Sequence, residues 1–137
     1  MQNPRKFTLT DLQKYPKSSY ITINYYSGKE GSVTRDYIGV PLIDLLNDAV
    51  ILTDANRKND ILWKYVSALA SDCYEVVISV AELLSNFGHQ QVLVAFATGD
   101  SQPLDDNEGM ARLIVPDDKA GGRCVSNITR IQVRSTP

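Results

Sequence analysis

The residues of this chain that could bind a ligand begin at the end of a predicted strand. Tyr25, Tyr26 and Ser27 stand in the stretch NYYSGKEG, directly after the alternating run SSYITI. Loops that follow strands often carry binding residues. Phenol and hydroxyl oxygens hydrogen bond well, but neither is a strong nucleophile without an activating base. The stretch is therefore a binding site, a site that has lost its reactive group, or a turn.

Other reactive residues fit known site patterns poorly. His89 is the only histidine, which excludes a multi-histidine metal site, and we expect an exposed imidazole at a helix end. The loop DDNEG departs from the calcium-loop pattern, because Gly109 stands where the third ligand belongs. Cys73 and Cys124 lie far apart and show no paired metal-ligand spacing. We expect two free, partly buried thiols, with a disulfide as an alternative in an oxidising compartment only.

The stretch AGGR, residues 120–123, has donors for a phosphate. Its two glycines expose backbone N–H groups, and Arg123 adds a guanidinium group. The spacing of a P-loop is absent, and the pattern by itself favours a turn. The nearby Asn127-Ile128-Thr129 matches a glycosylation sequon, but it falls inside a predicted strand.

Composition indicates a single domain over residues 1–137 and excludes several classes of partner. The chain has 137 residues, 43% of them hydrophobic, enough for one domain with a core of its own. The formal net charge is −2, so there is no basic field to attract nucleic acid. No apolar run approaches the ~20 residues of a transmembrane helix. No signal peptide is visible, and the sequence leaves the localisation open.

Strands dominate the predicted elements, and the fold class is α+β. Residues 19–26 and 32–40 form a hairpin with a four- or five-residue loop. A short amphipathic helix follows, with Pro41 at its first position. Residues 61–70 are a buried helix or strand, and alternation in 74–80 favours a hairpin that turns at Asp72-Cys73. The apolar face of the first helix consists of Leu42, Leu45, Leu46 and Ala49.

A second helix and three further strands complete the prediction. Ser79 and Glu82 form a capping box, Leu83, Leu84 and Phe87 supply an apolar face, and Gly88 occupies the left-handed C-cap. The remaining strands are predicted at residues 90–99, 111–116 and 127–133.

The order of these elements resembles a known family. YIGVPLIDLLNDA, YVSALASDCYEVVISVAELL, VLVAFATGDSQPL and GMARLIVPDDKAGGRCVSNITRIQV are similar to segments of the oxidoreductase molybdopterin-binding domain, the fold of sulfite oxidase and its bacterial relatives. The resemblance covers about residues 18–134. It implies a mixed, barrel-like β-sheet with two or three short helices, resolves residues 61–70 as strand, and implies molybdopterin as the cofactor and a periplasmic or secreted location.

The resemblance also identifies a missing metal ligand. In catalytic members a cysteine just after the first hairpin strand binds molybdenum, and thiolate suits that soft centre. Tyr25, Tyr26 and Ser27 occupy the matching positions here, so we expect no bound molybdenum. The family's basic and aromatic pair after Val125 is also replaced, by Ser126 and Asn127, whereas its two arginines are retained. The cofactor-binding residues that the resemblance implies are Tyr25, Tyr26, Ser27, Asp72, Tyr74, Arg112 and Arg123.

Three functions are consistent with the sequence. The first is a molybdopterin-domain-like module without molybdenum redox catalysis, whose ancestral cleft binds a small ligand or a protein partner. The second is a molybdopterin-dependent oxidoreductase with oxygen ligation of the metal, through Tyr25 or Ser27, and an electron-transfer partner. The third is a structural or interaction domain without a small-molecule site. Under the first, the predicted residues line one concave surface. Under the third, Arg112 and Arg123 point apart and merely pair with Asp117, Asp118 or Asp105.

Overall fold

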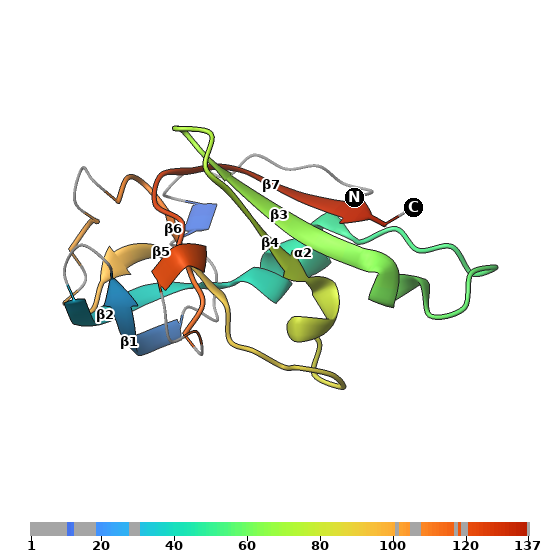
Figure 1. The fold of residues 1–137 in the computed structure, drawn as a ribbon, viewed down its shortest axis with the longest axis horizontal. Coiled ribbons are helices and arrows are strands. Elements are labelled where there is room, and N and C mark those ends of the chain that lie inside the picture. The colour runs from blue at the N-terminus through green and yellow to red at the C-terminus, as the bar shows by residue number, and fades with distance from the viewer. Residues whose placement is uncertain are drawn as a thin grey trace.

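The computed structural model describes residues 11–12, 19–27, 31–100, 102–104, 108–116, 118 and 121–136 (Figure 1). Side chains of residues 19–33 lie outside this description. The described part is mostly β: it contains seven strands, the α-helix α2 (Leu42–Ala49) and three single-turn 3-10 helices.

Four strands form the first sheet, in the order β1-β2-β5-β6, with every neighbouring pair antiparallel. The predicted first hairpin is confirmed, since pairing runs from Ser19 with Gly39 to Ser27 with Gly31, although its connection is only residues 28–30. A register shift follows Ile38, where a Cβ on Gly39 would lie 2.5 Å from the Val94 carbonyl oxygen. Glycine thus allows β5 to approach β2 closely. The four strands are β1 (Ser19–Ser27), β2 (Gly31–Pro41), β5 (Leu93–Thr98) and β6 (Arg112–Ile114).

The second sheet has the order β4-β3-β7, again antiparallel throughout. The ambiguous segment 61–70 is strand from Lys64 onward, and its first three residues belong to the 3-10 helix η1 (Asp60–Trp63). The β3–β4 hairpin turns where it was predicted. Cys73 has a left-handed φ of 71°, and its N–H donates to the Ala70 carbonyl at 3.1 Å. The three strands are β3 (Lys64–Ala70), β4 (Glu75–Ser79) and β7 (Ile128–Ser135).

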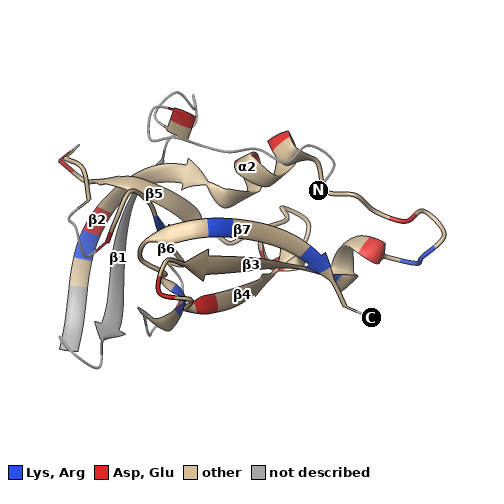
Figure 2. Ribbon diagram, turned by 90° about the horizontal axis from the view of Figure 1, so that it is seen from above, with Lys and Arg blue, Asp and Glu red and all other residues tan. Residues whose placement is uncertain are grey.

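The core joins both sheets to α2. Its largest cluster combines buried side chains from β2, β3, β4, β5 and β6 with the apolar face of the helix. The four apolar positions predicted for that face are all buried, and Pro41 is the N-cap rather than the first helical residue. Figure 2 shows α2 and the β3–β4–β7 sheet from above.

Two predictions about the architecture were wrong. The described strands form two open sheets, so the barrel-like closure is not found in this part of the chain. The second helix is only the 3-10 turn η2 (Val80–Glu82), although its capping box is present and Glu82 Oε2 accepts the Ser79 N–H at 2.8 Å. No α-helix follows η2 in the described residues. The chain instead folds back on itself, and the Gly88 N–H donates to the Ala81 carbonyl. The left-handed residue is His89, at φ 47°, rather than Gly88.

Candidate functional site

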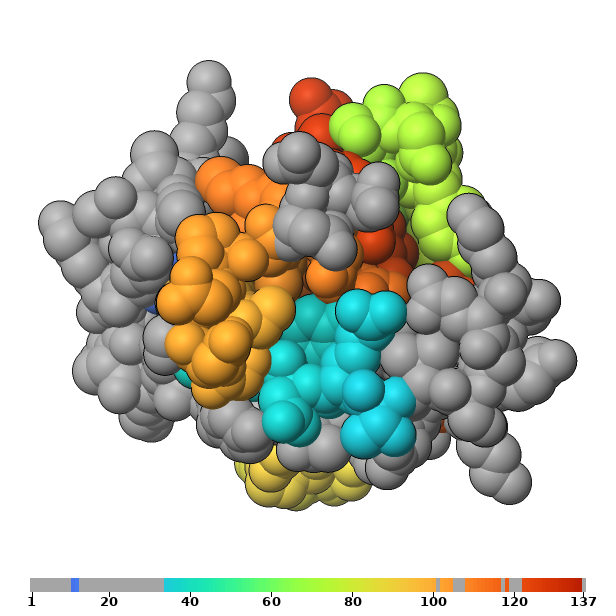
Figure 3. Space-filling model, turned by 90° about the vertical axis from the view of Figure 1, so that its left-hand side faces the viewer, coloured from blue at the N-terminus to red at the C-terminus, as the bar shows by residue number. Residues whose placement is uncertain are grey.

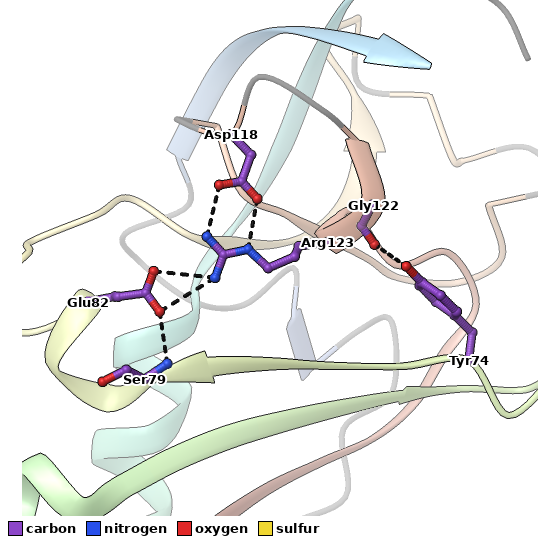
Figure 4. A network of polar contacts seen from close by, with 6 residues as sticks. All are labelled: Tyr74, Ser79, Glu82, Asp118, Gly122 and Arg123. Atoms are coloured by element: carbon purple, nitrogen blue, oxygen red, sulfur yellow. Dashed lines mark hydrogen bonds and ion pairs between the residues drawn. The ribbon is translucent and has the colours of Figure 1, made fainter. Parts of the chain in front are cut away.

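Arg123 lies between two carboxylates at the junction of the sheets (Figure 4). It ends the 3-10 helix η3 (Gly121–Arg123), and its Nε and Nη2 donate to the two oxygens of Asp118, each at 2.8 Å. Its Nη1 lies 3.3 Å from Glu82 Oε1. Hydrogen bonding to Asp118 is the main cause that raises the pKa of Arg123 above its usual value. One guanidinium between two ionised carboxylates gives this cluster a formal charge of −1.

Tyr74 connects the β3–β4 turn to η3. Its hydroxyl donates to the Gly122 carbonyl at 2.5 Å, and its backbone N–H donates to Asp72 Oδ1 at 3.1 Å (Figure 4). A pocket of about 440 Å³ lies elsewhere, and one of about 300 Å³ lies at this junction. The described residues that line the smaller pocket are Ala70, Asp72, Tyr74, Gly122, Cys124, Val125, Ser126 and Asn127.

Arg112 belongs to a buried network rather than to the wall of this pocket. Its Nη1 donates to Glu108 Oε2 and to the Tyr37 hydroxyl, both at 2.9 Å. Tyr37 in turn donates to the same Glu108 oxygen at 2.7 Å. The side chains of Arg112 and Glu108 are only 12% and 10% exposed. Arg112 contacts one residue of the smaller pocket's lining, since its Nε donates to the Cys124 carbonyl at 3.3 Å. Its charge is therefore neutralised inside the protein.

Part of the predicted site converges. Asp72 and Tyr74 share one pocket with η3, and Arg123 follows Gly122 directly. Strand β1, which carries Tyr25, Tyr26 and Ser27, contacts η3 through its backbone trace, but the side chains of these three residues lie outside the described part. Whether they line the pocket stays a prediction.

Two residues of the polar networks were not predicted from the sequence. Tyr37 and Glu108 meet across 71 positions of the chain, and no local pattern signals that contact. They also line the larger pocket, together with the Arg35–Tyr37 stretch of β2, the last residue of β5 and the two residues that follow it. Figure 3 shows these segments side by side on one face, with the described part of β2 in cyan and the segment before residue 100 in orange. The alternation of β2 predicts which face of the strand carries Tyr37, but it does not predict which residue Tyr37 contacts.

The two cysteines differ in their surroundings. Both are free, as predicted, but neither is partly buried: Cys73 is exposed in its turn and Cys124 is buried. Burial raises the pKa of the Cys124 thiol and so disfavours the thiolate that a metal needs. Among the residues described here, no group of three or more His, Cys, Asp and Glu side chains could hold a metal ion. His89 is exposed, as expected.

The contacts of the two arginines do not fit the phosphate of the cofactor that the fold implies. A pterin phosphate is best held by unpaired cations and backbone donors, whereas Arg112 and Arg123 are both engaged by carboxylates of the chain. Burial of Cys124, the cysteine in the pocket lining, raises its thiol pKa and disfavours a thiolate there.

The described part is a mostly β fold of two open antiparallel sheets that share a core with α2. Comparison with known proteins identifies its family. The sequence profile of the oxidoreductase molybdopterin-binding domain matches residues 1–137, so the chain belongs to that family. Among solved structures, it is similar to the sulfane dehydrogenase SoxCD from Paracoccus pantotrophus, with a TM-score of 0.75 and 22% sequence identity. The match covers 96% of this chain and 35% of that one, so the chain spans about a third of its length. A search of curated proteins gave no match. Among the described residues, no helix is long and apolar enough to cross a membrane.

Proposed function

We propose that this chain is a single-module member of the molybdopterin-binding domain family that does not perform molybdenum redox catalysis. It keeps the fold and the cleft at η3, and it binds a small ligand in that cleft. The observation that carries the proposal is the state of Arg123. This arginine directly follows Gly122 of the pocket lining, and two carboxylates of the same chain hold it.

The arrangement around Arg123 opposes an incoming phosphate. Asp118 takes two of the guanidinium donors in a bidentate contact, and Glu82 faces a third. A phosphate would have to displace a bidentate carboxylate, which is itself among the stronger charge-assisted contacts. It would also approach a cluster whose formal charge is −1. The same carboxylates therefore stabilise the fold around η3 and disfavour the family's anionic cofactor.

Cofactor analysis of the isolated protein tests the proposal. The full chain is produced in a host that synthesises the molybdenum cofactor, with a catalytic family member produced in parallel as the positive control. We expect molybdenum by elemental analysis and pterin by fluorescence after oxidation to be far below one per chain, and no sulfite oxidation. Stoichiometric molybdenum and pterin would overturn the proposal and favour oxygen ligation of the metal.

A further inference from the structure

The pocket between the β3–β4 turn and η3 has an unusual balance of hydrogen-bonding groups. Asp72 is exposed, and Tyr74 has 49% of its surface exposed. Oδ1 of Asp72 accepts the Tyr74 N–H, while Oδ2 accepts no hydrogen bond from the described residues. The hydroxyl of Ser126, also in the lining, makes no bond within that part of the chain either. Two oxygens are thus available to a ligand.

Further acceptor oxygens belong to this lining. The Gly122 carbonyl and the Tyr74 hydroxyl oxygen each have a lone pair left after their mutual bond. Asp72 supplies a full negative charge, and none of the described lining residues is a cation. Arg123, the nearest arginine along the chain, is occupied by Asp118 and Glu82. A ligand that satisfies these groups must bring hydrogen-bond donors and positive charge.

An aromatic wall adds to this preference. The ring of Tyr74 lines the pocket and remains half exposed, so a cation can lie against it. Planar guanidinium groups stack on such rings and present several N–H donors at once. The pocket volume of about 300 Å³ suits a small group of this kind and lies at the lower end of ligand-site volumes.

We infer that this pocket binds a small organic cation of the guanidinium or amidinium class, held by the Asp72 carboxylate, the Gly122 carbonyl and the ring of Tyr74. The inference rests on the proposed function, because it assigns a ligand class to the same cleft. It reverses the charge of the ligand relative to the family's anionic cofactor.

Titration of the full chain with methylguanidinium tests the inference. Amide signals of residues 71–74 and 122–127 are followed by heteronuclear NMR at constant ionic strength. Methylurea, similar in shape but uncharged, and inorganic phosphate are titrated separately. We expect methylguanidinium to shift these signals saturably, with methylurea weaker and phosphate without effect on them.

Matched variants locate the binding. Asp72→Asn keeps an oxygen for the Tyr74 N–H but removes the charge, and should weaken methylguanidinium binding by up to about fivefold. Tyr74→Leu should weaken it by about twofold to fivefold, whereas Tyr74→Phe keeps the ring and most of the affinity. Glu75→Gln is the control, because it removes a charge from the same hairpin at a residue outside the pocket lining. Dispersed amide spectra of each variant show that it is folded.

The outcomes separate clearly. Equal binding of methylurea, equal effects of Asp72→Asn and Glu75→Gln, or shifts with phosphate instead of methylguanidinium would each overturn the cation assignment. An absence of any saturable shift at these amides would overturn it as well. None of these results alters the molybdenum and pterin analysis, so failure of this inference and failure of the proposed function are read from different measurements.

Discussion

Replacement of Arg112 by methionine distinguishes a structural arginine from a ligand-binding one. The change removes the guanidinium that lies 2.9 Å from the Glu108 carboxylate, which is 10% exposed, and leaves the Tyr37 hydroxyl bond to Glu108 in place. Breaking one side of a buried ion pair costs about 3–5 kcal/mol, because the other charge stays buried without its counterion. The two partners here retain slight exposure, so we expect a loss near the lower figure, about 3 kcal/mol.

Equilibrium unfolding in urea, followed by far-UV circular dichroism, measures this loss. The double variant Arg112→Met with Glu108→Leu removes both charges and should recover most of the stability, since a buried pair is often replaceable by apolar residues. An arginine whose role was to bind a ligand at the surface would change the unfolding free energy by less than about 0.5 kcal/mol when removed. A loss that small in Arg112→Met, or no recovery in the double variant, would refute the assignment of Arg112 to the fold.

Three further predictions concern the turn, the thiols and one carboxylate. Cys73→Gly should raise the unfolding free energy by about 0.5–1 kcal/mol, because it relieves a left-handed residue whose side chain is exposed, and Cys73→Ala should not; a loss would show that the thiol is packed. With an aromatic disulfide reagent at pH 8, Cys73 should react rapidly and Cys124 only on unfolding, because Cys124 is buried and its thiol pKa is raised; equal rates would contradict this. The N–H of Asp54, followed by Lys64 and Arg57, lowers the pKa of Asp60 below its ordinary 3.8. Asp60 therefore contributes stability above pH 3.8 that is lost as the pH falls through its folded pKa. If the unfolding free energy of Asp60→Asn depends on acid pH as that of the natural chain does, this contribution is absent.

The sequence predicted local features well because short-range chemistry determines them. Alternation predicted both hairpins, including the turn at Asp72-Cys73, and the apolar spacing predicted α2. The capping box of Ser79 and Glu82 formed, yet the helix behind it did not extend. The apolar positions Leu83 and Leu84 fit a helix as well as a compact turn, so periodicity overestimated its length.

Contacts across long stretches of chain were beyond the reach of such patterns. Glu82 was predicted as a capping residue, but its second contact, with Arg123, spans 41 positions. Tyr37 and Glu108 meet across a still longer interval. These side chains come together only once the sheets have packed, and they determine which arginines remain available to a ligand. Whether the side chains of Tyr25, Tyr26 and Ser27 line the pocket at η3 stays a prediction.

The central claim is that Arg123 is engaged by the carboxylates of its own chain and not available to a phosphate. The most direct measurement follows the side-chain Nε–H signal of Arg123 by NMR while inorganic phosphate is added. We predict no saturable shift in the natural chain, and a saturable shift in the double variant Glu82→Gln with Asp118→Asn, where the cluster changes from a formal charge of −1 to +1. Glutamine keeps an oxygen for the Ser79 N–H, so the cap is retained. A saturable phosphate shift of Arg123 in the natural chain would contradict the claim.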